Sequence, residues 1–195
     1  RSGDTSSARE RDLFLVVSRL EEAKHVDDVI VAAARAGVLD RLRVVGHGPD
    51  RDRLVELLTT FGVSPAEVLV GRVDDAELDR LRDRARLLVS MSRSESYGIT
   101  LAEGLAAGAA VVASGIPAHR AVLASVPEEY CELVQEGDIE HLAVHFAAPP
   151  QLPPVGAYVR PWADVAAELD ALYRQIAARK RRFLTGRRGV GVQDG

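Results

Sequence analysis

Residues 87–114 read LLVSMSRSESYGITLAEGLAAGAAVVAS, and this stretch decides the fold that the sequence predicts. Its apolar run at 87–91 has the length of a strand and ends in a polar turn. A helical segment begins at about Gly98, and a second apolar run follows at 109–113. Strand, loop, helix and strand in this order are typical of an α/β unit with parallel strands.

Two carboxylates lie within this unit. Glu95 falls in the loop and Glu103 falls just over one helical turn past the helix start, so both can face the crevice at the carboxyl end of the strand. Between them lie the backbone amides that a helix leaves unpaired in its first turn, which suit a phosphate or a sugar hydroxyl. These amides belong to Gly98, Ile99, Thr100 and Leu101. Together the groups fit a nucleotide-sugar, although two Glu residues at this spacing are commonplace in a chain with 29 acidic residues.

The rest of the chain repeats the alternation of strand and helix. Further apolar runs of strand length lie at 13–17, 42–45, 68–70 and 130–134. Segments with helical spacing or helix caps lie at 21–37, 51–61, 75–84, 117–123 and 139–146. This order predicts a doubly wound, mostly parallel sheet with helices on both faces, a Rossmann-like α/β fold over residues 13–146.

Four segments flank this domain. Residues 1–12 are polar and small and do not open with Met, which indicates a linker or a cut edge of a longer chain. Residues 147–161 are rich in proline and predict an irregular connector. An apolar stripe predicts a C-terminal helix over 162–182, and the basic stretch 183–195 is expected to be disordered.

Two polar loops follow the first two predicted strands. Arg19 and Lys24 flank the first loop, where two cations can clamp a diphosphate or can simply be solvated surface groups. The second loop contains the turn Gly46, His47, Gly48. No third glycine follows in the spacing of the dinucleotide-binding fingerprint, which disfavours a Rossmann oxidoreductase.

Composition restricts the class of protein. The net charge is −4, whereas a nucleic-acid binder is usually distinctly basic, so no nucleic-acid partner is predicted. The single cysteine, Cys131, lies in an apolar run, which predicts a buried structural thiol and favours the cytosol. No apolar run approaches the ~18 residues of a membrane span. The basic tail predicts a solvated segment or, less favoured, a weak peripheral contact with the anionic inner face of a membrane.

Two other groups of residues, a histidine pair and three arginines, are not expected to form a functional site. His141 and His145 have metal-ligand spacing on one helix face, but the intervening Glu of the zincin motif is absent and no third ligand is near in the sequence. No metal site is therefore predicted. Arg82, Arg84 and Arg86 are expected to form a solvated rim.

The central stretch resembles the donor-site signature of family 4 retaining glycosyltransferases of the GT-B fold. The residues that carry this resemblance are Glu95, Ser96, Tyr97, Gly98, Glu103, Gly104 and Gly108. The family also carries a Gly-Arg-Leu then Lys pattern after its first strand, and here Ser18 stands at that Gly, before Arg19, Leu20 and Lys24. The resemblance covers nearly all of residues 13–178 and implies that the chain is the C-terminal, donor-binding half of such an enzyme.

The resemblance implies a role for each of these positions. Arg19 and Lys24 would bind the diphosphate, Glu95 the sugar hydroxyls and Glu103 the ribose hydroxyls. The nucleoside side of the pocket would be lined by Gly46, Gly48, Arg72 and Val73. It further implies transfer with retention from a nucleoside-diphosphate sugar without a metal or other cofactor. Its partner would be the N-terminal acceptor-binding domain of the same enzyme, without which this half is inactive.

Two alternatives remain open on the sequence alone. One is a degenerate, non-catalytic nucleotide-binding or assembly module, which departures from the family pattern favour; they lie at Ser18, Met91, Ala110 and Ala121. The retained charges at Arg19, Lys24, Glu95 and Glu103 count against it. The other is one half of a nucleotide-sugar epimerase, which shares the donor site.

Overall fold

The computed structural model of the 195-residue chain describes residues 11–158, 166–167 and 169–176. The chain divides into two compact units, Arg1–Val159 and Arg160–Gly195. In the second unit, residues 166–167 and 169–176 are helical, within the helix predicted over 162–182. The basic tail 183–195 and most of the predicted linker 1–12 lie outside the described residues.

The first unit contains a six-stranded parallel sheet in the order β3-β2-β1-β4-β5-β6. The strands are β1 (Leu13–Val17), β2 (Leu42–Val45), β3 (Leu69–Gly71), β4 (Ala85–Ser90), β5 (Ala110–Ser114) and β6 (Cys131–Val134). The order reverses between β1 and β4, and in doubly wound sheets a ligand crevice opens at the carboxyl ends of such a pair. The predicted Rossmann-like fold class is confirmed.

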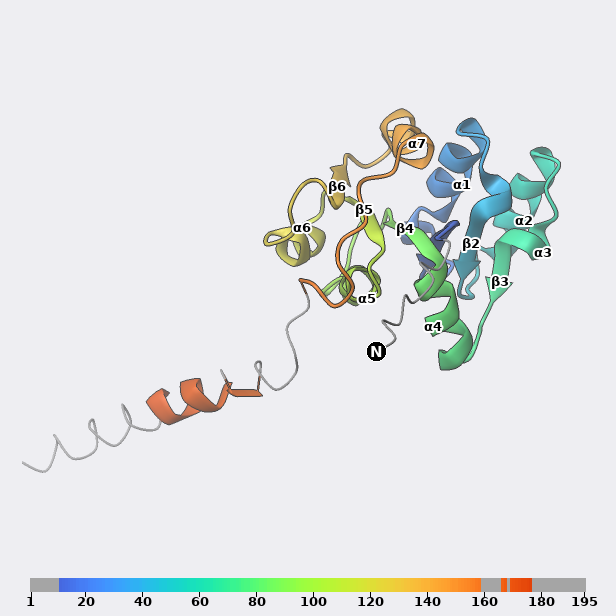
Figure 1. Ribbon diagram of the computed structural model, residues 1–195. Coiled ribbons are helices and arrows are strands. Elements are labelled where there is room, and N and C mark those ends of the chain that lie inside the picture. The colour runs from blue at the N-terminus through green and yellow to red at the C-terminus, as the bar shows by residue number, and fades with distance from the viewer. Residues whose placement is uncertain (1–10, 159–165, 168, 177–195) are drawn as a thin grey trace, which may run out of the picture. The chain divides into compact units, whose positions relative to one another are not determined.

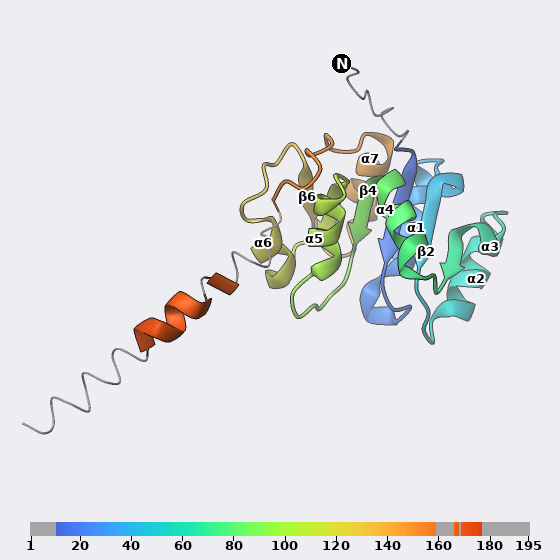
Figure 2. The ribbon, with the colours of Figure 1, turned by 60° about the horizontal axis from the view of Figure 1, so that its bottom comes forward.

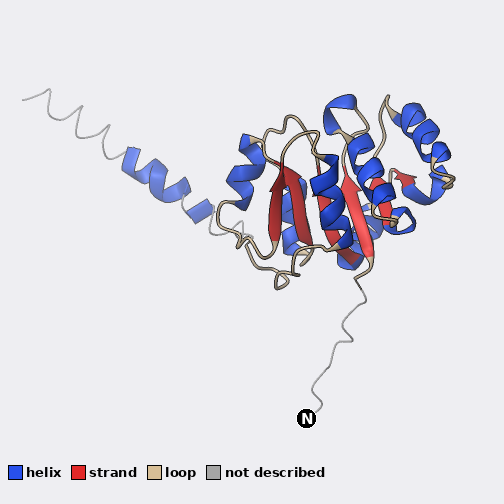
Figure 3. Cartoon of the chain, turned by 90° about the horizontal axis from the view of Figure 1, so that it is seen from above, coloured by secondary structure: helices blue, strands red, loops and turns tan. Residues whose placement is uncertain are grey.

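Helices cover both faces of this sheet (Figures 1 and 3). They are α1 (Val26–Arg35), α2 (Arg51–Thr60), α3 (Pro65–Val68), α4 (Asp75–Arg84), α5 (Ile99–Ala106), α6 (Pro117–Leu123) and α7 (Ile139–Ala147). One core cluster contains side chains from α1, α2 and α7, and the other contains side chains from α4, α5 and α6. The two sets of helices therefore pack on opposite faces, with α5 lying along β4 and β5 (Figure 2).

Successive residues of a strand belong to opposite core clusters, which explains why the strands are continuous apolar runs in the sequence. In β1, Phe14 belongs to the cluster under α1 and α7, whereas its neighbour Leu15 belongs to the cluster under α4 and α5. The ring of Phe14 packs edge-on against Phe146 of α7, with centroids 5.1 Å apart. Because successive side chains of a strand point to opposite faces, a sheet covered on both sides needs apolar residues at every position.

The structure changes one predicted helix and shows where the proline-rich segment lies. The helix expected over 21–37 is broken: a 3-10 turn over Glu22–Lys24 precedes α1, because His25 adopts a left-handed conformation with φ 48°. The proline-rich segment returns to the first unit, where the Gly156 amide donates to the Ala106 carbonyl at 2.9 Å. This contact anchors the connector to the end of α5.

Candidate donor site at the carboxyl edge of the sheet

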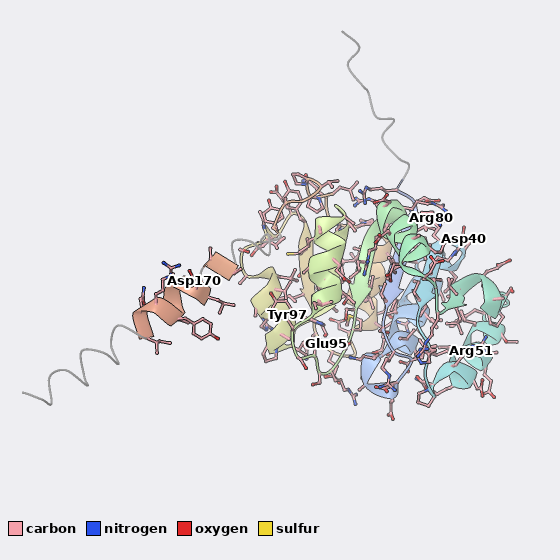
Figure 4. The ribbon with its side chains drawn as sticks, turned by 90° about the horizontal axis from the view of Figure 1, so that it is seen from below. Asp40, Arg51, Arg80, Glu95, Tyr97 and Asp170 are labelled. Atoms are coloured by element: carbon pink, nitrogen blue, oxygen red, sulfur yellow. The ribbon has the colours of Figure 1, made fainter. Side chains whose placement is uncertain are left out.

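Buried polar side chains gather at the carboxyl edge of the sheet. Among the described residues, those classed as buried are Ser92, Ser114 and His119. They follow or end β4 and β5, and α6 begins two residues before His119. Figure 4 shows Glu95 and Tyr97 at this edge and Arg80 at the opposite one. A polar cluster inside a hydrophobic domain costs free energy unless it is hydrogen-bonded, so its hydrogen bonds define the site.

Lys24 and Glu95 meet where the strand order reverses. The Lys24 ammonium donates to Glu95 Oε1 at 2.6 Å, although Lys24 follows β1 and Glu95 follows β4. Their side chains are only 17% and 27% exposed. The Arg93 amide also donates to the Ala23 carbonyl at 2.8 Å. The two loops are thus joined by a charge-assisted pair and by a backbone hydrogen bond.

Glu95 is held in its ionised form. Burial acts to raise the pKa of its carboxyl, but hydrogen bonds from Lys24 and Ser92 together with the Lys24 charge bring the pKa below its ordinary value. Ser92 Oγ donates to Glu95 Oε1 at 2.9 Å. The carboxylate therefore has a fixed position and can accept hydrogen bonds from a ligand hydroxyl.

His119 continues the network beneath the loop. Its Nδ1 lies 3.0 Å from the Ser114 carbonyl oxygen, which can only accept, so Nδ1 carries the proton. Ser114 Oγ in turn donates to the Ser92 carbonyl. Burial lowers the pKa of His119, and its Nε2 is buried without a partner in the described part of the chain. His119 thus presents a neutral imidazole with an unused lone pair.

Gly98 begins α5 directly above this imidazole. Its φ is 84°, and a Cβ at this position would lie 3.2 Å from Cδ2 of His119. The amide of Leu101 donates to the Gly98 carbonyl at 3.1 Å, so the expectation that this amide is a free donor is wrong. Helix geometry leaves the amides of Ile99 and Thr100 as the donors of the first turn.

Two predicted site residues make other contacts. Arg19 is 67% exposed and pairs with Glu21 at 2.7 Å. Glu103 faces α4, where the Arg82 guanidinium donates to its carboxylate. Arg82 is only 15% exposed, so its prediction as part of a solvated rim is wrong. The sheet brings α4 and α5 together, and this pairing of two helices cannot be read from the local sequence.

The glycine turn after β2 lies against the backbone of the loop after β1. A Cβ on Gly46 would lie 1.7 Å from the Ser18 carbonyl oxygen, and one on Gly48 would lie 2.2 Å from that of Leu20. The Leu20 amide donates to the His47 carbonyl at 3.0 Å. Both glycines are therefore required by this close backbone contact, whatever ligand the turn also lines.

Arg72 and Val73 follow β3 at the same edge of the sheet. Arg72 Nε donates to Nδ1 of His47 at 2.9 Å, which links the loops after β2 and β3. The Gly46 amide also donates to the Gly71 carbonyl at 2.8 Å. The loops after β2 and β3 thus form one rim, which is joined to the Lys24 loop after β1.

Comparison with known proteins assigns this chain to a family. Residues 3–147 match the family described as glycosyl transferases group 1. The chain belongs to that family. Among curated relatives, it is 31% identical to D-inositol 3-phosphate glycosyltransferase of Mycolicibacterium paratuberculosis, over 98% of this chain and 47% of that protein. It is 35% identical to glycogen synthase of Mycobacterium tuberculosis, over 53% of this chain and 26% of that protein.

Solved glycosyltransferases of the GT-B fold share the architecture. Sucrose-phosphate synthase from Thermosynechococcus elongatus superposes with a TM-score of 0.66 and 24% identity, covering 89% of this chain and 47% of that one. The pneumococcal O-GlcNAc transferase GtfA, in complex with UDP and GlcNAc, superposes with a TM-score of 0.57 and 20% identity. This match covers 74% of this chain and 29% of that one. The chain spans less than half the length of each of these glycosyltransferases. No described helix is long and apolar enough to cross a membrane.

The sequence analysis missed three members of the site. Ser92 and Ser114 are small polar residues at strand ends, and such residues also occur at ordinary turns. His119 gave a stronger signal, because a histidine near a helix start at the carboxyl edge of a sheet is a candidate ligand. The helical pattern of 117–123 did not show which face of that helix is buried.

Proposed function

We propose that this chain is the donor-binding domain of a glycosyltransferase that moves a sugar from a nucleoside-diphosphate sugar to an acceptor with retention of configuration. The contact of Lys24 with Glu95 at 2.6 Å carries this proposal. It places one cation and one hydroxyl-accepting carboxylate in the same crevice, which are the two kinds of group that a diphosphate and a sugar need.

The charges have separate roles in the reaction. As the bond between the anomeric carbon and the diphosphate oxygen breaks, negative charge grows on that oxygen, and Lys24 neutralises it. Arg19, which is exposed and pairs with Glu21, turns to the same diphosphate. Glu95 accepts hydrogen bonds from sugar hydroxyls. These charges and the α5 amides supply the stabilisation that a metal ion gives in other transferases, so no metal is needed for the step.

The nucleoside occupies the rim formed by the loops after β2 and β3. Glu103 accepts hydrogen bonds from the ribose hydroxyls, and Arg82 orients its carboxylate. Gly46, Gly48, Arg72 and Val73 line this side of the pocket, while Gly98, Ile99, Thr100 and Leu101 surround the phosphate and sugar at the start of α5. The acceptor is bound by an N-terminal domain of the same enzyme, so this half alone does not transfer sugar.

Calorimetric titration with UDP, GDP and ADP tests the proposal. We expect one of the three diphosphates to bind the parent chain, and Lys24→Ala to weaken that binding at least about tenfold, the cost of one charge-assisted hydrogen bond. Arg80→Ala is the matched control, because Arg80 pairs with Glu77 at the opposite edge of the molecule. Equal affinity of the parent and Lys24→Ala, or no binding of any diphosphate, would contradict the proposal and favour a non-catalytic module.

A further inference from the structure

Three potential metal ligands converge on the edge strand of the sheet. Glu132 lies on β6, and His141 and His145 lie on α7. One ligand atom from each residue falls within 4.8 Å of the other two. The two imidazole Nε2 atoms are 3.2 Å apart. This cluster is distinct from the donor site, because Lys24 and Glu95 follow the central strands.

The fold itself sets the position of this cluster. Residues four apart on a helix share one face, so His141 and His145 are neighbours on α7. The same helix buries Leu142 and Phe146 in the core cluster that contains Val134. Side chains two apart on a strand point to the same face, so Glu132 lies on the α7 side of β6 with Val134. Packing of α7 against the sheet thus brings the carboxylate to the imidazole pair.

A carboxylate lies on the Nδ1 side of His141. Asp138 caps α7 by accepting from the His141 amide at 3.0 Å, and its carboxylate lies 4.0 Å from Nδ1 of His141. A carboxylate on that side favours the proton on Nδ1 and leaves the lone pair on Nε2. A metal ion binds the neutral form of the ring.

The spacing also fits a coordination sphere. Two nitrogens about 2.05 Å from a tetrahedral Zn²⁺ lie roughly 3.3 Å from each other. The observed separation of 3.2 Å matches this spacing. Without an ion, the same pair makes at most one hydrogen bond between two imidazoles, which gives Glu132 no role.

We propose that Glu132, His141 and His145 bind a divalent transition metal ion, with Zn²⁺ as the best match, and that water completes the coordination. Two imidazoles and one carboxylate suit Zn²⁺, whereas Mg²⁺ and Ca²⁺ select sites made of oxygen ligands. The ion links α7 to the edge strand β6 and so stabilises this end of the sheet. It takes no part in sugar transfer, and the site goes beyond the proposed function.

The absence of a predicted metal site in the sequence analysis has a clear cause. The sequence shows the metal-ligand spacing of His141 and His145 but not the third ligand. Glu132 lies on the preceding strand, and only the packing of α7 on the sheet places it beside the pair. We now infer a metal site at a position for which the sequence alone predicted none.

The test uses the full 195-residue chain without a polyhistidine tag, freed of metal by a chelator and dialysed. Zn²⁺ is titrated calorimetrically, and Co²⁺ is added in parallel because its visible absorption reports the coordination geometry. We expect one Zn²⁺ per chain, a Co²⁺ spectrum with nitrogen ligation, and a higher melting temperature in the presence of Zn²⁺. Glu132→Gln and His145→Gln should each weaken Zn²⁺ binding by at least about tenfold, because each removes one ligand.

Glu140→Gln is the matched control. Glu140 lies on the same helix but pairs with Arg35, so this variant should bind Zn²⁺ as the parent does. The proposal is overturned if the parent binds no Zn²⁺, or if the double variant His141→Gln, His145→Gln binds it as tightly as the parent. It is also overturned if Glu132→Gln binds Zn²⁺ within twofold of the parent, since the site would then be only a pair of surface histidines. Melting temperatures without metal show whether each variant is folded.

Discussion

Lys24 and Glu95 lie 2.6 Å apart across the point where the sheet reverses its strand order. In the proposed donor complex, Lys24 pairs with a diphosphate and Glu95 with sugar hydroxyls. The free site therefore holds a contact that the ligand has to replace. A bound diphosphate competes with Glu95 for the Lys24 ammonium.

Because of this competition, we expect removal of the Glu95 charge to raise the affinity for the nucleoside diphosphate. Glu95→Gln keeps an oxygen that accepts from Ser92 but removes the charge that holds Lys24. Partly exposed ion pairs contribute about 1 kcal/mol, so the nucleoside diphosphate that binds the parent should bind this variant roughly fivefold more tightly. Calorimetry measures the change, with Asp12→Asn as control because Asp12 precedes β1 at the amino edge of the sheet and pairs with Arg84. A weaker affinity in Glu95→Gln would show that the carboxylate supports diphosphate binding.

We expect the buried His119 to make the folded chain less stable as the pH falls. The pKa of the folded residue lies below its usual 6.5, because burial disfavours the charged ring. The unfolded chain therefore gains a proton as the pH falls through 6.5, while the folded chain gains it only at lower pH. Stability contributed by the neutral ring is present above 6.5 and is lost progressively as the pH falls towards the folded pKa.

The measurement is the free energy of unfolding in urea at pH 7 and at pH 5. His119→Asn can still donate to the Ser114 carbonyl but does not titrate. We expect this variant to lose less stability between the two pH values than the parent does, even though its stability at pH 7 is lower. An identical loss in both proteins would mean that His119 does not cause it.

The sequence predicted the sheet well because its strands have an unambiguous pattern. β1 and β5 are covered on both faces, so every residue except Ser114 at the end of β5 is apolar and the run stands out. His25 shows the limit of this reasoning. Its φ of 48° ends the 3-10 turn and starts α1, and helical periodicity contains no signal for a non-glycine residue in that conformation. The short helix α3 was missed because one turn has too few residues to show a period.

The candidate site was predicted less completely, since it depends on contacts between distant segments. Lys24 and Glu95 were selected from loops that follow adjacent parallel strands, and the fold brings them together. Arg82 reaches Glu103 only because the sheet order places α4 beside α5. The burial of His119 depends on how α6 rotates against the sheet, and its sequence is too short to fix that rotation.

We expect a side chain at Gly46 to have a large steric effect on stability. Its φ is 147°, and an added Cβ would lie 1.7 Å from the Ser18 carbonyl oxygen, where neither backbone can move freely. Gly46→Ala should lower the free energy of unfolding by at least ~3 kcal/mol. Gly62 is the matched control: its φ is 71° with nothing within 4 Å, so Gly62→Ala should cost only about 1 kcal/mol. Urea unfolding measures both, and equal losses would rule out the tight contact with Ser18.

We expect the Cys131 thiol to react slowly in the folded chain. Burial, together with the charges of Glu132 and Glu128, raises its pKa to about 11. At pH 8 the thiolate that attacks disulfides is therefore scarce and shielded. A chromogenic disulfide reagent should modify one equivalent of Cys131 rapidly in denaturant and far more slowly without it. Equal rates in the two conditions would show that the segment before β6 opens readily.

Glu103 offers a test that separates nucleoside recognition from diphosphate recognition. If its carboxylate accepts hydrogen bonds from ribose hydroxyls, Glu103→Ala should weaken nucleoside diphosphate binding about tenfold and leave inorganic pyrophosphate binding unchanged. Lys24→Ala should weaken the binding of both ligands. Arg82→Ala should resemble Glu103→Ala but with a smaller effect, because Arg82 only orients the carboxylate. Competition calorimetry with the two ligands measures the pattern. If Glu103→Ala weakened pyrophosphate binding equally, Glu103 would act on the fold of the site and not on the ribose.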